Sequence, residues 1–564
     1  MNRIVLSFVF LFAAVIVQAQ VSGVTWSEEM KFNKGSMEFK VIGSDKTGFF
    51  LQESHQVVKS YFVIGYSVRD VAKLIRMDKN MVEQYNNDFA KELKGKEFER
   101  FLFVKDRLFI IADDYNKKEL QLMIYFAEVD KATGSLKGDW KLLETLYAED
   151  KTKAIQYKFD YTGDSSKVVF VNTILGKETN AYHISILGPD LSPVTKYPPI
   201  TNEFDPKTYV LEDVLVAPAG QVLLLGRENE YVEGKKKKDK FLQFKNYNTR
   251  IYGTNGKLIK EIKTDSEKKW LVNSKALINN NDIVMAAFYS DERKKKEING
   301  LVVMRIDPAT GNLVSDQTME LNKGMISIVE EDDDDEEKKS KKKDDDDEEE
   351  GLSGDLVFRK FVIAPDNSFV FFAEKVSSRL VSYTTYSGTG ASRSAMTTSY
   401  IHYECGDIYT AKIDVSGKIN WFYTFPKFQR ERIPAGVSAG TLPSSSAAYF
   451  LRRVDKPYYA GFGVANAGGK SFLFFNDNPK NAGVTKAGQR VKTLNYNFDK
   501  TDCYTLEVNL LTGEMKRRVA FSNNDIPNAM PRLGNQLGNT FYFIGKTDKT
   551  FGKAKVVVGK CTVK

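Results

Sequence analysis

Histidine, cysteine and tryptophan are scarce in this chain of 564 residues, with three, three and four copies. Three cysteines cannot form the disulfide framework of a small secreted scaffold, and three histidines leave few candidates for a metal site. With 15 prolines and 39 glycines, no long low-complexity linker divides the chain. Hydrophobic residues nevertheless make up 42% and aromatic residues 12%, which excludes an intrinsically disordered chain.

The N-terminus predicts export. Residues 1–19 begin with the basic Arg3, continue in an apolar run over residues 4–17 and end at the small Ala19, the pattern of a secretory signal peptide. An uncleaved membrane anchor is the alternative, but a run of about 14 apolar residues is too short to span a bilayer. No later segment approaches the roughly 18 consecutive apolar residues of a membrane-spanning helix. We therefore expect one domain over residues 20–564, periplasmic or extracellular, without a transmembrane segment.

All three cysteines belong to this mature chain, namely Cys405, Cys503 and Cys561. An odd count allows at most one disulfide, and the sequence leaves open which two residues, if any, form it. Their spacing matches no zinc motif. We expect small apolar side chains in strands.

Charge is unevenly distributed. Residues 330–350 contain 15 Asp or Glu and five Lys, whereas the rest of the mature chain has 76 basic and 59 acidic residues, a net charge of +17. A like-charge block without apolar side chains cannot bury a core, so we expect a disordered insertion over residues 325–353. The basic remainder favours a polysaccharide or protein partner, including an anionic one. Export and the lack of an aromatic–basic motif argue against nucleic acid.

Short β-rich units recur along the chain. In each of eight segments a turn with Gly, Asn, Asp or Pro precedes four to seven apolar or aromatic residues, which is typical of a hairpin. These segments are residues 43–51, 104–111, 161–171, 216–225, 278–288, 363–372, 464–475 and 533–544. A second unit, an Asp- or Asn-rich turn between strands, alternates with the first at residues 74–81, 127–136, 184–194, 251–259, 303–313, 411–421 and 508–515.

Two hairpins per unit predict one four-stranded blade per unit, and therefore an all-β propeller of about eight blades, with seven as the alternative. The eighth unit ends after a third strand near residues 555–563. We expect residues 24–32, with Trp26, to supply its fourth strand and close the ring. The composition of residues 71–98 permits a helix, but the turn at residues 77–80 falls in register and favours strands.

One segment carries a family resemblance. Asp414, Gly417 and Trp421 have the spacing of the repeat in quinoprotein-like β-propellers, and residues 131–140 and 307–313 resemble it more weakly. The chain thus resembles secreted propellers of this type in architecture. That group includes cofactor-binding dehydrogenases and non-enzymatic outer-membrane assembly scaffolds. The adjacent cysteines of some quinone enzymes are absent, so the resemblance implies no cofactor.

Motifs that carry chemistry are few, and we assign no catalytic, cofactor-binding or metal-binding residue. Gly436, Ser438 and Gly440 match the G-x-S-x-G nucleophile elbow, but that triad order needs a histidine after the serine, and all three histidines precede it. The adjacent acids Asp113 and Asp114 have the residue type of glycosidase carboxylates. We interpret them as a solvated turn at a hairpin tip.

The strand order of a propeller places the long connections on one face. Within a blade, the turns that join strand one to strand two and strand three to strand four lie on one face of the propeller. The connections from strand two to strand three, and from one blade to the next, lie on the other face. The long segments, residues 235–240, 291–297, 325–353, 377–400 and 429–456, all belong to the second kind. Binding sites are commonly built on such loops, although harmless insertions would gather there too.

Residues 377–400 hold 12 Ser or Thr, three Tyr and no acid, which suits a sugar or peptide bound through hydrogen bonds and aromatic faces. We expect a non-enzymatic propeller that binds a protein or glycan partner at the cell envelope. The alternative is an envelope enzyme acting on glycans with acids at the central funnel. The candidate ligand-face residues are Lys235, Lys236, Lys237, Lys238, Tyr383, Tyr386 and Tyr400.

Overall fold

The computed structural model describes most of the mature chain. The described residues are 23–31, 36–61, 65–148, 154–162, 166–175, 180–202, 208–233, 240–263, 269–279, 282–291, 297–321, 328–330, 352–353, 356–387, 394–434, 457–524, 528–547 and 555–564. The expected signal peptide, Lys235–Lys238, Ser438 and most of the acidic insertion lie outside these residues.

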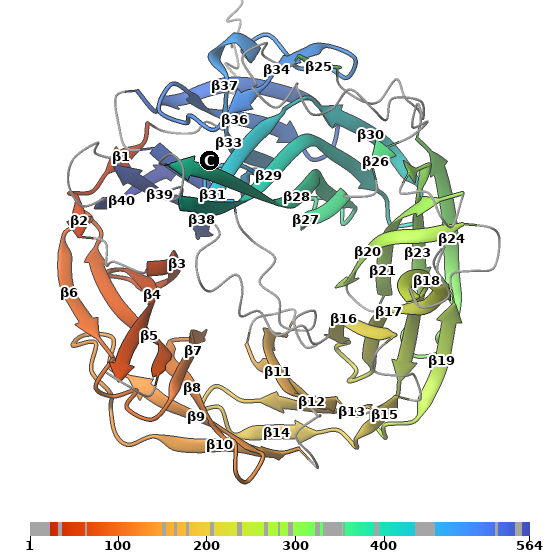
Figure 1. Cartoon of the computed structure of the whole chain (residues 1–564). Coiled ribbons are helices and arrows are strands. Elements are labelled where there is room, and N and C mark those ends of the chain that lie inside the picture. The colour runs from red at the N-terminus through yellow and green to blue at the C-terminus, as the bar shows by residue number, and fades with distance from the viewer. Residues whose placement is uncertain are drawn as a thin grey trace, which may run out of the picture.

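Strands arranged in a ring dominate the described chain (Figure 1). Blade one consists of β3 (Ser36–Ser44), β4 (Gly48–Tyr61), β5 (Gly65–Asp78) and β6 (Glu83–Asp88), and blade two of β7 (Glu97–Val104), β8 (Arg107–Asn116), β9 (Gln121–Val129) and β10 (Lys141–Tyr147). Blade three consists of β11 (Ala154–Tyr161), β12 (Val168–Leu175), β13 (Asn180–Leu187) and β14 (Pro193–Lys196), and β15 (Ile200–Asn202) also pairs with β13. Blade four consists of β16 (Tyr209–Val216), β17 (Val222–Glu233), β18 (Lys240–Tyr252) and β19 (Leu258–Lys263).

Four further sheets complete the ring. Blade five consists of β20 (Trp270–Asn279), β21 (Asp282–Ser290), β23 (Gly300–Ile306) and β24 (Leu313–Glu320), and blade six of β27 (Leu356–Ile363), β28 (Phe369–Ser387), β29 (Ser394–Ile413) and β30 (Ile419–Phe425). Blade seven consists of β32 (Gly463–Ala467), β33 (Lys470–Asp477), β36 (Asp502–Asn509) and β37 (Met515–Ser522). Blade eight consists of β38 (Asn528–Leu537), β39 (Thr540–Thr547) and β40 (Lys555–Thr562), with β1 (Thr25–Trp26) and β2 (Met30–Lys31) paired to β40. Eight four-stranded antiparallel blades confirm the predicted propeller.

Short elements decorate the connections. Two small sheets pair β22 (Glu297–Ile298) with β26 (Leu352–Ser353), and β25 (Ile328–Glu330) with β34 (Arg490–Lys492). Blade six is widened by β31 (Gln429–Pro434) and β35 (Leu494–Asn495), and the 3-10 helix η5 (Pro479–Asn481) follows β33.

Eight of the nine apolar clusters in the described residues lie between neighbouring blades, one at each junction. The last cluster closes the ring, because it joins blade eight to blade one through residues such as Ile544 and Val41. Phe49 and Tyr542 lie with their ring centroids 4.5 Å apart across this junction. Each blade therefore buries both of its faces against neighbours, which is how radial repetition stabilises a propeller.

The N-terminal strand completes blade eight as predicted. Thr25 pairs with Lys560 and Trp26 with Gly559, and the Trp26 ring lies over Gly559, where a Cβ would be 2.9 Å from the indole. The indole also contacts Phe521 of blade seven, with centroids 5.4 Å apart. One aromatic side chain thus links the first strand, the last blade and its neighbour.

The third-to-fourth turns explain the second sequence repeat. In blades two, five, six and seven an Asp or Asn side chain accepts a backbone N–H two residues on, as Asp414 does from Ser416 at 2.8 Å. A glycine with positive φ then completes each of these four turns. That glycine lies against the preceding blade, since a Cβ on Gly513 would lie 2.5 Å from Tyr423. The motif therefore shapes the hairpin and packs the blade against its neighbour.

Substitution of this glycine should destabilise the ring. Gly513 has a φ of +75°, so Gly513→Ala adds backbone strain as well as the clash with Tyr423, and we expect a loss of about 1–3 kcal/mol. The urea midpoint of unfolding measures it. Gly483→Ala is the matched control, because no atom lies within 4 Å of its added Cβ. Equal midpoints for the two variants would contradict this role of the turn.

Candidate functional site

A pocket of about 550 Å³ opens where blades six, seven and eight meet. Every residue of its lining comes from a second-to-third or a blade-to-blade connection, or from a strand end beside one. It therefore lies on the face where the sequence places the long connections. The lining residues are Glu431, Arg432, Ile433, Tyr458, Tyr459, Tyr496, Asn497, Phe498, Asp499, Asn528 and Lys546.

Alternate residues of one strand build the pocket wall. Glu431 of β31 is buried, and its carboxylate accepts the backbone N–H groups of Tyr458, Tyr459 and Ala460 at 2.8–2.9 Å. Burial raises the pKa of Glu431 despite these three bonds. Two residues earlier, the Gln429 amide oxygen accepts the N–H of Gly461 at 2.8 Å. Because strand residues alternate between faces, one face of this segment holds the backbone of residues 458–461.

A buried ion pair continues this face. The Lys427 ammonium donates to Glu374 at 2.6 Å and to Gln429 at 2.8 Å, and Arg359 donates to the same Glu374 at 2.9 Å. Burial raises the pKa of Glu374, but Lys427 and Arg359 outweigh it and hold that pKa below its ordinary value. The charged network thus fixes β31 and the pocket wall to blade six.

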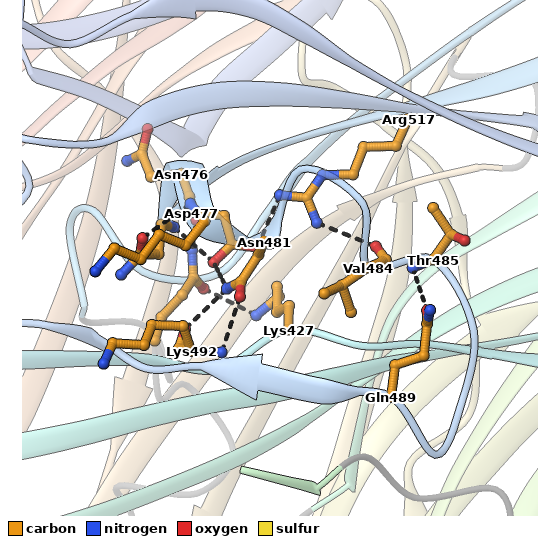
Figure 2. A network of polar contacts seen from close by, with 12 residues as sticks. Lys427, Asn476, Asp477, Asn481, Val484, Thr485, Gln489, Lys492 and Arg517 are labelled. Atoms are coloured by element: carbon orange, nitrogen blue, oxygen red, sulfur yellow. Dashed lines mark hydrogen bonds and ion pairs between the residues drawn. The ribbon is translucent and has the colours of Figure 1, made fainter. Parts of the chain in front are cut away.

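The opposite wall comes from an insertion, residues 478–501, between β33 and β36. Figure 2 shows its anchor, where the buried Asp477 binds Arg517 at 3.0 Å and Asn481 at 2.9 Å. Asn481 also exchanges two hydrogen bonds of 2.8 Å with the backbone of Lys492. Further along, β35 pairs in parallel with β31. The insertion therefore carries residues 496–499 to the pocket.

Four aromatic rings contact one another at the pocket, and two of them flank one arginine; we name Tyr383, Tyr400, His402, Arg432 and Tyr496 the Tyr–Arg cluster. The Arg432 guanidinium lies 4.8 Å from the ring centroid of Tyr400 and 5.3 Å from that of Tyr496. Such contacts hold a guanidinium without neutralising it. Arg432 is exposed and forms no ion pair with the described residues, whereas Arg430 binds Glu404 at 3.1 Å. The cluster therefore presents an uncompensated cation.

Tyr496 has an unusual backbone. Its φ is +45°, a left-handed conformation that is rare for a bulky residue. The Tyr496 hydroxyl lies 3.2 Å from Nδ1 of the buried His402, which is on β29. Strained backbone of this kind is concentrated at binding and catalytic sites. Here it directs an aromatic ring toward Arg432.

The predicted ligand-face residues are only partly brought together. Tyr383 and Tyr400 are cross-strand neighbours in the hairpin of β28 and β29, with centroids 6.0 Å apart, and both belong to the cluster. Tyr386 pairs with Ala395 nearer the hairpin end. Residues 377–387 and 394–400 are strands that extend this hairpin. The four lysines Lys235–Lys238 lie outside the described residues.

The sequence does not predict the residues of the pocket. Arg432, Tyr496 and Phe498 carry no motif, and long-range pairing of β31 with β35 brings them together. One signal was present, since Lys427, Gln429 and Glu431 alternate as polar residues with period two. A buried polar face was not inferred from it.

An acid of inner strand β16 links neighbouring blades. Asp213 of β16 binds Lys158 of β11 at 3.4 Å and Lys275 of β20 at 2.8 Å. Burial raises the pKa of Asp213, but the two lysines outweigh it and lower that pKa overall. This triad therefore links blades three, four and five. No cluster of three or more His, Cys, Asp or Glu suited to a metal occurs in the described ranges.

The interpretation of Asp113 and Asp114 as a hairpin tip is wrong, because both lie within β8. Residue 113 is opposite Glu97 and Ile124 in the sheet, and its carboxylate accepts the Tyr157 hydroxyl at 2.5 Å. Burial, with the charges of Glu99 and Glu97, raises the pKa of Asp113 to about 7 despite that bond. The packing of blade two against blade three leaves this acid only partly exposed to solvent.

Asp113 should make stability fall as pH rises. In the folded protein the Asp113 carboxyl keeps its proton up to about pH 7, whereas in the unfolded chain it releases the proton near pH 4. The free energy of unfolding therefore falls as the pH rises between these two values and stays lower above pH 7. We expect Asp113→Asn to stabilise the protein by about 2–4 kcal/mol at pH 8 and much less at pH 5. Urea unfolding at both pH values measures this, with Asp114→Asn as the control. A gain that does not depend on pH would contradict the assignment.

The three cysteines are free and buried. Burial raises the pKa of the Cys405 thiol to about 12, so it remains protonated and unreactive near neutral pH. Cys405 packs with Ala460, Leu494 and Phe498 in a small apolar cluster beneath the pocket. As predicted from their spacing, the cysteines are small apolar residues of strands.

Comparisons with known proteins bear on the fold alone. No family model and no curated protein matches the chain. Similar solved structures include prolyl oligopeptidase B from Galerina marginata (12% identity, 61% of this chain and 39% of that one, TM-score 0.28) and Synechocystis apocarotenoid oxygenase (12%, 71% and 91%, 0.29). Another is the β-propeller domain of the Trilobed protease from Pyrococcus furiosus (10%, 72% and 98%, 0.29). The match thus spans well under two thirds of the oligopeptidase, and likenesses this weak carry no information on function.

Proposed function

We propose that this chain is an exported, non-enzymatic β-propeller of the quinoprotein-like type that binds a protein or glycan partner at the cell envelope. One observation carries the proposal. A pocket bordered by aromatic rings and an exposed arginine lies on the long-connection face, and a buried polar network fixes its walls. Concave sites with a few placed polar groups are where ligands bind.

Two further features support this proposal. The basic and apolar residues 1–19 have the pattern of an export signal, and no helix in the described ranges is long and apolar enough to cross a membrane. The strained φ of Tyr496 places an aromatic ring beside Arg432 at a cost in stability. Such a cost is reasonable where the ring contacts a ligand.

Binding to envelope fragments tests the proposal. The labelled mature chain is mixed with washed envelope from its source cells, and the bound fraction is measured by co-sedimentation over a range of concentrations. We expect saturable binding that Tyr496→Gly weakens about tenfold or more. Glycine removes the ring without adding strain at this positive φ. Tyr423→Ala, at a 45% exposed tyrosine of β30, is the control. Equal binding of the two variants would contradict the proposal, and so would release of cleaved saccharides.

A further inference from the structure

We infer that the Tyr–Arg cluster and its pocket bind an acidic saccharide, with a uronic-acid carboxylate on Arg432 and sugar rings against the tyrosines. This inference rests on the proposed function and narrows its partner.

The cation is arranged for an external carboxylate. The planar guanidinium of arginine binds a carboxylate through two parallel hydrogen bonds and can stack on aromatic rings at the same time. Arg432 is held by Tyr400 and Tyr496 at 4.8 and 5.3 Å and forms no ion pair with any described residue. Its exposed side chain therefore keeps its hydrogen-bond donors for a ligand.

The surrounding groups suit a sugar. Aromatic faces carry a partial negative charge that attracts the weakly positive C–H groups of a pyranose. The half-buried Tyr459 stacks on the buried Phe498 with centroids 5.1 Å apart, and Tyr383 is 36% exposed on the hairpin. Asn497, Asn528 and Asp499 also line the pocket, where Asn528 donates to Asp499 and the Asn497 side chain accepts the backbone N–H of Asp499 at 3.1 Å. The remaining hydrogen-bonding capacity of these side chains suits hydroxyl groups, which a neutral apolar ligand lacks.

The charge of the chain suits a polyanionic saccharide. Outside residues 330–350, residues 20–564 carry a net charge of +17, which attracts a polyanion. On β31, β29 covers one edge over residues 429–434, whereas β35 pairs with the other edge at Gln429 and Arg430. Peptides often bind by adding a strand to an open sheet edge, so binding of a peptide along Arg432 is an outcome that the test has to separate from binding of a saccharide.

Titration with trigalacturonate and its methyl ester tests the inference. The two ligands have the same rings, but the ester has no charged carboxylate. We expect the full mature chain to bind the acid about tenfold or more tightly than the ester in isothermal titration calorimetry. Arg432→Gln should remove that difference. Arg518→Gln, at an exposed arginine of β37, deletes the same charge elsewhere and should change affinity less than about twofold.

The outcomes separate this inference from the proposed function. No binding of trigalacturonate, equal binding of its ester, or equal effects of Arg432→Gln and Arg518→Gln would each overturn the acidic-saccharide inference. Binding of a hexapeptide through its C-terminal carboxylate in place of the saccharide would also overturn it. In these cases envelope binding that depends on Tyr496 would still support the proposed function. Because Arg432 is exposed, Arg432→Gln should fold normally, which its urea midpoint verifies.

Discussion

Deleting residues 20–31 should make the mature chain associate into larger oligomers and aggregate. The deletion removes β1 and β2, and with them the backbone bond from Ser27 to Val558 at 2.8 Å and the contact of Trp26 with Phe521. The edge of β40 is then unpaired, and open edges recruit other chains. Loss of Trp26 alone should cost about 3 kcal/mol. Size-exclusion chromatography with light scattering measures the association, and urea unfolding measures the stability.

A shorter deletion is the control for ring closure. Removing residues 20–23 leaves β1 and β2 intact, so this variant should keep the association state and the urea midpoint of the mature chain. If the longer deletion behaves in the same way, the N-terminal strand does not close the ring. Gly559→Val offers a second test, because the new side chain would displace the Trp26 ring from its place over the strand.

Lys427→Met should be the most destabilising single substitution near the pocket. The lysine side chain is fully buried with Glu374, and methionine would leave that carboxylate with Arg359 as its remaining cationic partner among the described residues. Removing one partner of a buried ion pair typically costs about 3–5 kcal/mol. The lowered pKa of Glu374 keeps it charged at neutral pH. The urea midpoint of unfolding at pH 7 measures the loss.

A double substitution isolates the charge. Adding Glu374→Gln to Lys427→Met removes the uncompensated carboxylate and should recover much of the lost stability. Loss of Lys427 removes the main charge that lowers the pKa of Glu374, so this pKa rises in the single variant. The recovery should therefore shrink as the pH falls and Glu374 becomes protonated in the single variant. If Lys427→Met is as stable as the native chain, the network does not hold the pocket wall.

Local chemistry explains why the fold could be predicted. The Asp414 and Gly417 turn specifies a hairpin within eight residues, and its recurrence indicates a propeller of about eight blades, with seven left open, without any knowledge of contacts. The last strand of the chain, near residue 555, likewise needed a fourth strand beside it to complete blade eight, and residues 25–26 supply that strand. Such signals suffice because each blade repeats the same short-range solution.

The pocket depends on interactions that no local pattern encodes. Arg432 and Tyr496 are 64 positions apart in the sequence and meet through the parallel pairing of β31 with β35. Two-residue strands such as β35 leave no periodic signal. The hairpin tyrosines Tyr383 and Tyr400 were identified because they lie in a biased segment. Asp113 was misassigned because its burial depends on Tyr157 of the next blade.

Hydrogen–deuterium exchange tests most directly the claim that the partner binds at the pocket face. The full mature chain is compared with and without saturating solubilised envelope. We predict slower exchange of backbone amides in residues 457–462 and 494–499, which line or border the pocket, and no change in the turns at residues 414–418 and 509–513 on the opposite face. Protection of those turns with the pocket segments unchanged would contradict the account.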